Sequence, residues 1–308
     1  MITVDRLTKT YGARTALEAI SFEVPKGEIF GFVGPNGAGK TTTMRILAGL
    51  LEPTAGRALI DGADVVAHPD RVHDRLGYMP DFFGVYDQLT AAEYLDFYAA
   101  CYQQPKARRQ KIADDLLELV GLADRRDQSV DTLSRGMKQR LCLARALVHD
   151  PAVLLLDEPA SGLDPRARVE MREILKELQQ MGKTILISSH ILPELTELCS
   201  MIGIIDHGRM RATGPVQEVI RQLTAGRRLR ITVLGKKDEA LALLRDMPAV
   251  REVDLAGGSI QAAFEGDEAT AASILQGLIA GGIQVSDFTQ IEGGLEAAFL
   301  KATTEELA

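Results

Sequence analysis

The sequence predicts an α/β protein with a largely parallel central sheet, followed by a smaller α+β domain. Two apolar runs, 152–156 and 184–188, are typical of strands buried on both faces of a sheet. Up to about residue 215, strand-like runs alternate with segments of helical periodicity, the order typical of parallel sheets. Near residue 225 the composition changes, and the tail beyond it repeats a strand–helix–strand order.

The predicted elements of the first part follow in chain order. Strands are predicted at 2–5, 20–24, 28–33, 57–61, 75–79, 152–156, 184–188, 201–206 and 209–213. Helices are predicted at 40–50, 91–103, 107–120, 135–148, 166–181 and 192–199. The helix-rich stretch from about 80 to 150 interrupts the alternation, so we expect a helical subdomain inserted in a first domain of residues 1–220.

The tail, residues 226–308, is predicted to be a small second domain of ferredoxin-like α+β type. Strands are predicted at 228–234, 249–255, 258–264 and 283–289, and helices at 237–246, 267–281 and 294–302. Glycine pairs at 257–258 and 281–282 mark turns. Two strand–helix–strand units in succession are typical of the split βαβ arrangement.

Composition and charge exclude several classes of protein. The 308 residues carry a net charge of −8, which argues against general affinity for nucleic acid. No apolar run reaches the roughly 18 residues of a spanning helix, and no basic start with an apolar block suggests a secretory signal. Cys101, Cys142 and Cys199 are scattered, as expected of reduced thiols. We therefore expect a cytoplasmic location.

The segment 34–41 fits G-x-x-x-x-G-K-[ST], the phosphate-binding loop of nucleoside-triphosphate enzymes. A predicted strand precedes it and a predicted helix follows it, which is the context that the motif requires. Its glycines let backbone N–H groups approach a phosphate. We expect Lys40 to reach the β- and γ-phosphates and Thr41 to bind Mg²⁺. The predicted nucleotide-binding residues here are Gly34, Pro35, Asn36, Gly37, Ala38, Gly39, Lys40, Thr41 and Thr42.

Two carboxylates end the apolar strand predicted at 152–156. Asp157 is placed to hold Mg²⁺ through water, the usual partner of a phosphate loop. Glu158 is placed to polarise the attacking water as general base. Both assignments depend on the phosphate loop upstream.

The segment 133–140 reads Leu-Ser-Arg-Gly-Met-Lys-Gln-Arg and precedes a helical run. With the two preceding motifs, it resembles the ATP-binding cassette (ABC) ATPases, whose signature is L-S-G-G-Q at this place. The resemblance covers roughly residues 2–220 and implies a P-loop NTPase fold. It implies that Ser134 and Gly136 bind the γ-phosphate held by the opposite subunit. Arg135 and Met137 depart from the common form of the signature.

Three further residues match the family in its own order. Asp164, in Ser-Gly-Leu-Asp, resembles the D-loop that lines the dimer seam. His190 resembles the switch histidine that senses the γ-phosphate, and the resemblance gives it a catalytic role. Tyr11 matches the aromatic residue that stacks on adenine, although a tyrosine near a strand end also commonly serves in packing.

One position departs from the family where a glutamine usually precedes the helical subdomain. Asp81 stands there, either facing Mg²⁺ through water or capping a turn. After it come the aromatic residues Phe82, Phe83, Tyr86, Tyr94, Phe97 and Tyr98. In transporters of this family, this region receives a short cytoplasmic helix of the membrane partner. These residues form either the core of the subdomain or an anchor for that partner.

The resemblance implies an ATPase subunit that works as a head-to-tail dimer of identical chains, with two ATP molecules in the seam. Because the chain has one nucleotide domain and no predicted span, the permease is expected to be a separate chain. The segment 293–301 resembles the L-E-x-x-F-L ending of a bacterial exporter subgroup, as do Arg135 and Met137. This predicts export and a peripheral position on the cytoplasmic face of the membrane. The tail joins the subunits, regulates them or only stabilises the fold.

The alternative function is a soluble ABC ATPase that acts on ribosomes or DNA. Translation factors of the family usually carry two cassettes, and this chain carries one. The repair enzymes carry long coiled coils, and no sustained heptads occur between residues 50 and 150. A small-molecule kinase would share the phosphate loop but would not explain Ser134, Asp164 and His190 together.

Overall fold

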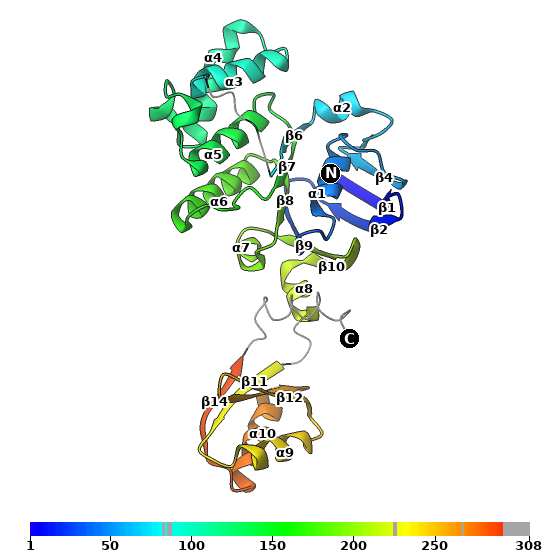
Figure 1. Cartoon of the computed structure of the whole chain (residues 1–308), viewed down its shortest axis with the longest axis vertical. Coiled ribbons are helices and arrows are strands. Elements are labelled where there is room, and N and C mark those ends of the chain that lie inside the picture. Colours follow the sequence, from blue (N-terminus) through cyan, green and yellow to red (C-terminus); the bar gives the residue numbers. More distant parts are fainter. Residues whose placement is uncertain (82–83, 85–87, 224–226, 267, 292–308) are drawn as a thin grey trace. The chain divides into compact units, whose positions relative to one another are not determined.

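The computed structural model describes residues 1–81, 84, 88–223, 227–266 and 268–291 (Figure 1). The chain divides into two compact units, Met1–Val216 and Gln217–Ala308. No helix in the described ranges is long and apolar enough to cross a membrane. The predicted helix at 294–302, the tail motif at 293–301 and the aromatic residues Phe82, Phe83 and Tyr86 lie outside the described residues.

The first unit contains two sheets, where the sequence predicted one. A six-stranded sheet has the order β10–β9–β3–β8–β7–β6, and every neighbouring pair is parallel except β10 and β9. Its strands are β3 (Ile29–Val33), β6 (Leu76–Met79), β7 (Val153–Asp157), β8 (Thr184–Ser189), β9 (Met201–Asp206) and β10 (Arg209–Pro215). This is the predicted, largely parallel central sheet.

The strands predicted at 2–5, 20–24 and 57–61 belong to a separate antiparallel sheet of order β2–β1–β4–β5. Its strands are β1 (Ile2–Tyr11), β2 (Arg14–Val24), β4 (Ala55–Ile60) and β5 (Ala63–Asp64). Only Gly12 and Ala13 separate β1 from β2. Two residues are enough for a hairpin but far too few for a parallel crossover, so this pair had to be antiparallel.

Helix α1 (Lys40–Leu47) lies between these two sheets (Figure 1). Its residues Met44, Ile46 and Leu47 are fully buried in a core that also contains Phe22 of β2 and Phe32 of β3. The hydrophobic stabilisation of this core holds both ends of the loop between β3 and α1. The predicted phosphate loop is therefore a short segment between two elements anchored in this core.

The helical subdomain is formed by α3 (Ala91–Cys101), α4 (Lys106–Leu119) and α5 (Arg135–Ala146). Two 3₁₀ turns, η1 (Ala123–Arg125) and η2 (Val130–Thr132), lead from α4 to α5. Helix α3 begins in a capping box, in which Thr90 and Glu93 satisfy each other's backbone N–H groups. The remaining helices of the unit are α2 (Pro69–His73), α6 (Pro165–Gln180) and α7 (Leu192–Thr196). Helix α2 was not predicted because five residues are too few to show a helical period.

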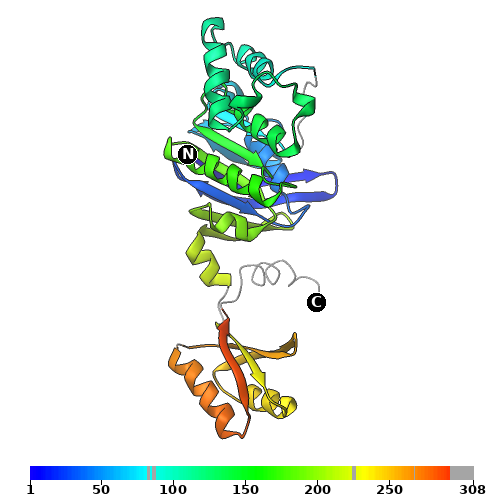
Figure 2. The same cartoon turned by 90° about the vertical axis from the view of Figure 1, so that its left-hand side faces the viewer.

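Helix α8 (Val216–Leu223), also not predicted, leads into the second unit, which is a four-stranded antiparallel sheet with two helices. Its elements are β11 (Arg227–Val233), α9 (Lys237–Arg245), β12 (Val250–Ala256), β13 (Ser259–Phe264), α10 (Glu268–Ala280) and β14 (Val285–Ile291). The order β12–β13–β11–β14 interleaves two βαβ units in the ferredoxin-like manner. Helix α10 runs beside β14 (Figure 2), and side chains of both helices pack with the sheet in one apolar core.

Candidate functional site

The loop between β3 and α1 is shaped by close backbone approaches that only glycine permits. Gly39 precedes α1 with a φ of 113°, and a Cβ there would lie 2.6 Å from Leu17. A Cβ on Gly34 would lie 2.3 Å from the carbonyl oxygen of Ile205. Gly37 has a φ of 84° and open space around its Cα. The backbone therefore forms a cradle next to the helix N-terminus, and this cradle fits a phosphate group.

A cleft of about 380 Å³ opens over this cradle. It brings together residues that the sequence predicted from four separate segments: Tyr11, Asn36, Gly37, Gly39, Lys40, Thr41, Thr42, Asp81 and Glu158. Arg14 and Ala16, at the start of β2, also line it and were not predicted. Tyr11 is 48% exposed at the cleft, with the Lys9 ammonium 5.2 Å from its ring centre. The lysine lies over one face of the ring, and the half-exposed side chain borders the cleft in which a base would stack.

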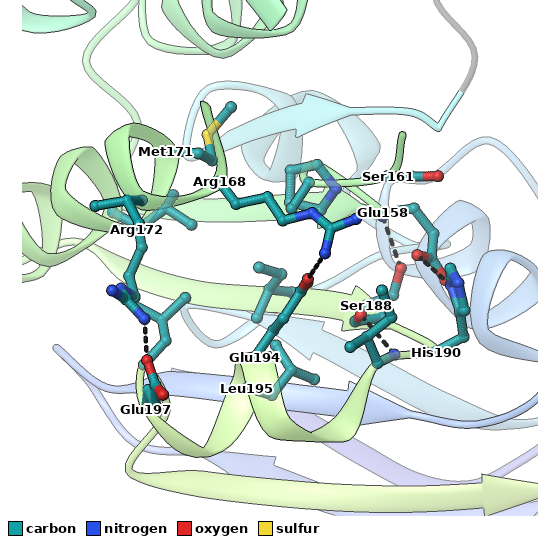
Figure 3. A pocket seen from close by; sticks show the side chains of 18 of the residues that line it. Glu158, Ser161, Arg168, Met171, Arg172, Ser188, His190, Glu194, Leu195 and Glu197 are labelled. Carbon is teal, nitrogen blue, oxygen red and sulfur yellow. Dashed lines mark hydrogen bonds and ion pairs between the residues drawn. The ribbon is translucent and has the colours of Figure 1, made fainter. Parts of the chain in front are cut away.

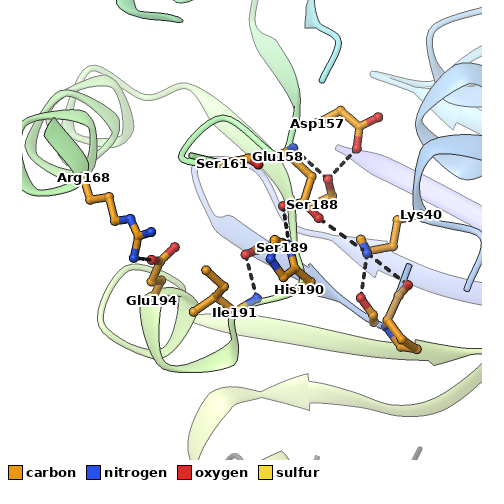
Figure 4. Close-up of polar contacts among 12 residues, drawn as sticks. Lys40, Asp157, Glu158, Ser161, Arg168, Ser188, Ser189, His190, Ile191 and Glu194 are labelled. Atoms are coloured by element: carbon orange, nitrogen blue, oxygen red, sulfur yellow. Dashed lines mark hydrogen bonds and ion pairs between the residues drawn. The ribbon is translucent and has the colours of Figure 1, made fainter. Parts of the chain in front are cut away.

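Lys40, Glu158 and His190 form a chain of polar contacts at the carboxyl ends of the central strands (Figure 4). The Lys40 ammonium is nearly buried, donates to the carbonyl oxygen of Gly34 at 2.6 Å, and lies 3.5 Å from Glu158 Oε1. Glu158 Oε2 lies 2.9 Å from His190 Nδ1. The backbone of Glu158 has a φ of 51°, an uncommon left-handed conformation for a residue with a side chain. Such strain is typical of functional sites.

Asp157 is buried beside this chain, and one of its carboxylate oxygens has no protein partner. Asp157 Oδ1 accepts a hydrogen bond of 2.6 Å from the Ser188 hydroxyl, whereas Oδ2 is buried without a hydrogen bond. Burial raises the pKa of Asp157, and this effect outweighs the hydrogen bonds from Ser188 and Thr41, which lower it. A cation at Oδ2 would relieve both the missing contact and the desolvated charge.

These residues fit Mg²⁺. The donor set is hard oxygen, from the Asp157 carboxylate and the Thr41 hydroxyl. Within the described ranges no group of three or more His, Cys, Asp or Glu side chains could form a metal cage. Mg²⁺ is usually held by one or two protein ligands together with substrate phosphates, so the pair is sufficient. Asp81 lies exposed at the edge of the cleft, near enough that its charge also raises the pKa of Asp157.

Ser134, Gly136 and Asp164 do not line this cleft as the structure describes it. Ser134 begins α5 and accepts from the Met137 N–H, while Asp164 begins α6 and accepts from the Ala167 N–H. The starts of the two helices lie close together. A Cβ added to Gly136 in α5 would lie only 3.3 Å from Leu163, which directly precedes Asp164. The signature and D-loop segments thus contact each other, and Ser134, Gly136 and Asp164 lie outside the cleft over the predicted phosphate loop of the same chain.

Two contacts that the sequence did not reveal join these segments, and a third residue, Ser188, contacts the end of β7. Gln139 is buried in α5 and donates to the carbonyl oxygen of Ser161 at 3.1 Å. The Arg135 guanidinium lies against Gly162, where an added Cβ would come within 2.4 Å of it. The signature variant Arg135 thereby contacts the D-loop of its own chain. Ser188 contacts both Asp157 and the Glu158 backbone, and no motif marks it in the sequence.

A second cavity, of about 270 Å³, lies between α6 and α7 on the far side of Glu158 and His190 (Figure 3). Two ion pairs cross it, Arg168 with Glu194 at 2.8 Å and Arg172 with Glu197. Helix α6 starts directly after Asp164, and α7 starts shortly after His190. The ion pairs therefore link the D-loop segment to the switch segment.

Known proteins resemble the chain in sequence and in structure. A sequence profile described as ABC transporter matches residues 17–161. The chain is 35% identical over 253 residues to the linearmycin resistance ATP-binding protein LnrL of Bacillus subtilis (strain 168), covering 82% of this chain and 81% of LnrL. It is 40% identical over 220 residues to the Nod factor export ATP-binding protein I of Ralstonia nicotianae (strain ATCC BAA-1114 / GMI1000). This match covers 71% of this chain and 68% of that protein.

Two solved structures share the fold of the first unit. The structure of an ATP binding subunit of an ABC transporter has a TM-score of 0.66 at 32% identity, covering 73% of this chain and 93% of that one. The dimeric structure of MJ0796, a bacterial ABC transporter cassette, has a TM-score of 0.64 at 26% identity. The match covers 70% of this chain and 99% of MJ0796.

Proposed function

The chain belongs to the ATP-binding proteins of the ABC transporter family, and from this premise we propose that it drives export through a separate membrane permease. It is an ATPase, and ATP is its nucleotide. The observation that carries the proposal is the chain of contacts from Lys40 through Glu158 to His190, beside the buried Asp157. This arrangement suits phosphoryl transfer to water, in which catalysis is mainly positioning and charge stabilisation.

Each side chain has a part in hydrolysis. The cradle at Gly34, Gly37 and Gly39 binds the phosphates, and the Lys40 ammonium neutralises their charge. Thr41 and Asp157 hold Mg²⁺, which supplies further charge stabilisation when bound.

Glu158 takes a proton from the attacking water, and its oxygens are already held by Lys40 and His190. His190 keeps the carboxylate oriented, as a base requires. In this proposal Asp81 would help to hold the same cation through water, and Tyr11 would stack on adenine.

A second copy of the chain completes the site. Ser134, Gly136 and Asp164 lie outside the cleft over the phosphate loop of their own chain, and in this proposal they reach a γ-phosphate across a dimer seam. The dimeric structure of the related cassette supports this assembly. ATP binding closes two nucleotide-binding subunits head to tail, and hydrolysis lets them open. The free energy of closure is passed to the permease.

The permease docks at an aromatic groove between the central sheet and the helical subdomain. This groove has a volume of about 370 Å³ and is lined by Ala48, Leu50, His73, Leu76, Tyr78, Tyr98, Tyr102, Arg145 and Ala146. Leu50 is 57% exposed at its rim, and Tyr102 is 40% exposed. Exposed apolar and aromatic residues around a concavity favour an apolar helix of a partner. The chain then sits peripherally on the cytoplasmic face of the membrane.

The test of the chemistry is Glu158→Gln, with Glu173→Gln as control, because Glu173 is an exposed carboxylate on α6. We expect phosphate release by Glu158→Gln to fall by about 10²- to 10⁴-fold. ATP should accumulate in a dimer measurable by light scattering, while Glu173→Gln behaves as wild type. Unchanged turnover in Glu158→Gln would contradict the assignment of the base.

The test of the partner uses the same trapped protein, tagged and expressed in its own host. Membranes are solubilised in mild detergent, and the proteins that co-purify are identified. We expect a multi-span membrane protein at a near one-to-one ratio, and we expect Leu50→Arg to abolish its recovery while leaving ATP hydrolysis intact. Recovery only with ribosomes or DNA would instead favour a soluble ATPase outside transport.

A further inference from the structure

Among the described residues, Ser188 is the one whose hydroxyl contacts both the Asp157 carboxylate and the Glu158 backbone (Figure 4). It is fully buried near the end of β8, directly opposite Asp157 of β7 in the parallel register. Its hydroxyl donates to Asp157 Oδ1 at 2.6 Å and accepts from the Glu158 N–H at 3.0 Å. One side chain from a neighbouring strand therefore holds two consecutive residues at once.

The hydrogen-bonding capacity of a hydroxyl explains why this contact orients both groups. A serine has a single O–H donor, and here it is used on Asp157. Because that donor holds Oδ1, the carboxylate cannot rotate freely, and Oδ2 is left as the buried oxygen without a protein partner. The lone pair that accepts from Glu158 stabilises its left-handed backbone, with a φ of 51°.

We propose that Ser188 is a positioning residue for hydrolysis, which presents Asp157 Oδ2 to Mg²⁺ and holds the Glu158 backbone in its strained conformation. The inference rests on the proposed roles of Asp157 and Glu158. Ser188 touches neither nucleotide nor water in this scheme and acts only through its two neighbours. A partner of a metal-ligating carboxylate typically changes metal affinity or activity by about 10- to 100-fold when it is removed.

The competing explanation is that Ser188 only satisfies a buried backbone donor. Thr184, at the start of the same strand, provides a matched control for that role. It too is fully buried, and its hydroxyl accepts from the Gly27 N–H at 2.9 Å. Thr184→Val and Ser188→Ala each remove one buried hydroxyl from β8 and leave a backbone N–H without its acceptor. Only Ser188→Ala also releases a carboxylate.

The experiment compares Ser188→Ala, Ser188→Thr and Thr184→Val in the full-length protein. Mn²⁺ binding in the presence of ATP is measured by electron paramagnetic resonance, together with the Mg²⁺ dependence of turnover and the thermal unfolding midpoint. We expect Ser188→Ala to weaken Mn²⁺ binding by about 10-fold and to lower kcat by about 10- to 100-fold. Ser188→Thr, which keeps the hydroxyl, should restore both. Thr184→Val should lose comparable stability but keep wild-type metal binding and kcat.

Wild-type Mn²⁺ affinity and kcat in Ser188→Ala would overturn the proposal, as would equal losses in Thr184→Val. If Ser188→Ala does not fold, Ser188→Cys keeps the size with a weaker donor and is measured in the same way. The roles on which the inference rests are tested separately by Asp157→Asn and Glu158→Gln. Wild-type turnover in those variants would refute the proposed function, whereas losses there with an unaffected Ser188→Ala would refute only the role of Ser188.

Discussion

The two compact units of the chain bury different kinds of side chain. The first unit buries charged residues, among them Lys40, Asp157 and Asp206. All of the buried side-chain atoms without a hydrogen-bond partner among the described residues also belong to it. The core of the second unit, as far as it is described, is formed by apolar side chains alone. Its ion pairs, such as Arg251 with Glu265 at 2.7 Å, lie at the surface.

The difference indicates that the first unit buries charged groups at a cost in folding stability, as a binding site for a charged ligand requires. Moving a charge out of water costs several kcal/mol unless it is paired, so an unpaired buried carboxylate oxygen indicates a ligand-binding role. Asp157 has such an oxygen, Oδ2, whereas the buried Oε1 of Glu158 is paired with the Lys40 ammonium at 3.5 Å. The second unit, in contrast, has no buried charged side chain among its described residues. We therefore expect substitutions in the first unit to change nucleotide chemistry and those in the second to change stability.

The largest expected effect is that of Lys40→Ala on ATP binding. Removing one partner of a buried charge pair typically costs about 2–5 kcal/mol, which is at least about 30-fold in affinity. Isothermal titration with ATP and Mg²⁺ measures this loss. Lys237→Ala is the control, because Lys237 is an exposed lysine of the second unit that donates to the Gly258 carbonyl oxygen. Tight ATP binding by Lys40→Ala would contradict the phosphate-loop assignment.

The next effect concerns the core of the second unit. Leu229 is fully buried in β11, and Leu229→Ala should cost about 2–5 kcal/mol of its unfolding free energy. Leu255 of β12 is 56% exposed, so Leu255→Ala should change that free energy by less than about 0.5 kcal/mol. Urea unfolding measures both. If nucleotide chemistry depends on the first unit alone, the ATPase rate of Leu229→Ala without denaturant should remain within about twofold of wild type. A large fall in that rate would mean that the two units are not separate in function.

A third prediction concerns surface charge, in which the two units should behave alike. Hydrogen bonds from the backbone and side chain of Thr90 lower the pKa of Glu93 in the first unit. Hydrogen bonding and the charge of Arg251 lower the pKa of Glu265 in the second. A lowered pKa in the folded state gives stability that is present above the unfolded value of 4.5 and is lost as pH falls through the folded value.

Glu93→Gln and Glu265→Gln should therefore lower the unfolding midpoint at pH 7. The difference from wild type should disappear in acid, when the wild-type carboxyl is itself protonated. Thermal unfolding followed by circular dichroism between pH 7 and about pH 3 checks this, using the two variants as controls for each other. A difference that is constant over this range would show that the carboxylate charge is not responsible.

The smallest effect is the labelling of thiols, which reports only on the first unit because the cysteines all lie there. Cys101 is exposed, whereas burial raises the pKa of the Cys142 thiol to about 11 and raises that of Cys199 as well. A thiolate is the reactive form, so brief alkylation of the native protein should add one equivalent, at Cys101. Mass spectrometry of tryptic peptides identifies the site. Rapid labelling of Cys142 would mean that the helical subdomain opens readily.

Much of the fold follows from local sequence. The predicted helix at 107–120 corresponds to α4 (Lys106–Leu119), and the strand at 201–206 coincides with β9. Periodicity, helix-capping residues and glycine pairs act over a few residues, so one sequence is enough to reveal them. The separate antiparallel sheet was missed because strand propensity does not determine which strands pair. That depended on the short hairpin between β1 and β2.

The sequence by itself indicated the phosphate-loop motif, the two carboxylates Asp157 and Glu158 at the end of β7, and the family to which the chain is similar. The loop and the carboxylate pair are short motifs of neighbouring residues, and the loop also needs glycines that can adopt a positive φ. Only the tertiary structure decided that Ser188 stands opposite Asp157, 31 residues away in the chain, and that Ser134 lies outside the cleft that Lys40 lines. The physical reason is that sheet register and helix packing are set by burial of the whole core. The residues that orient a catalytic group can therefore come from any strand that this core brings beside it.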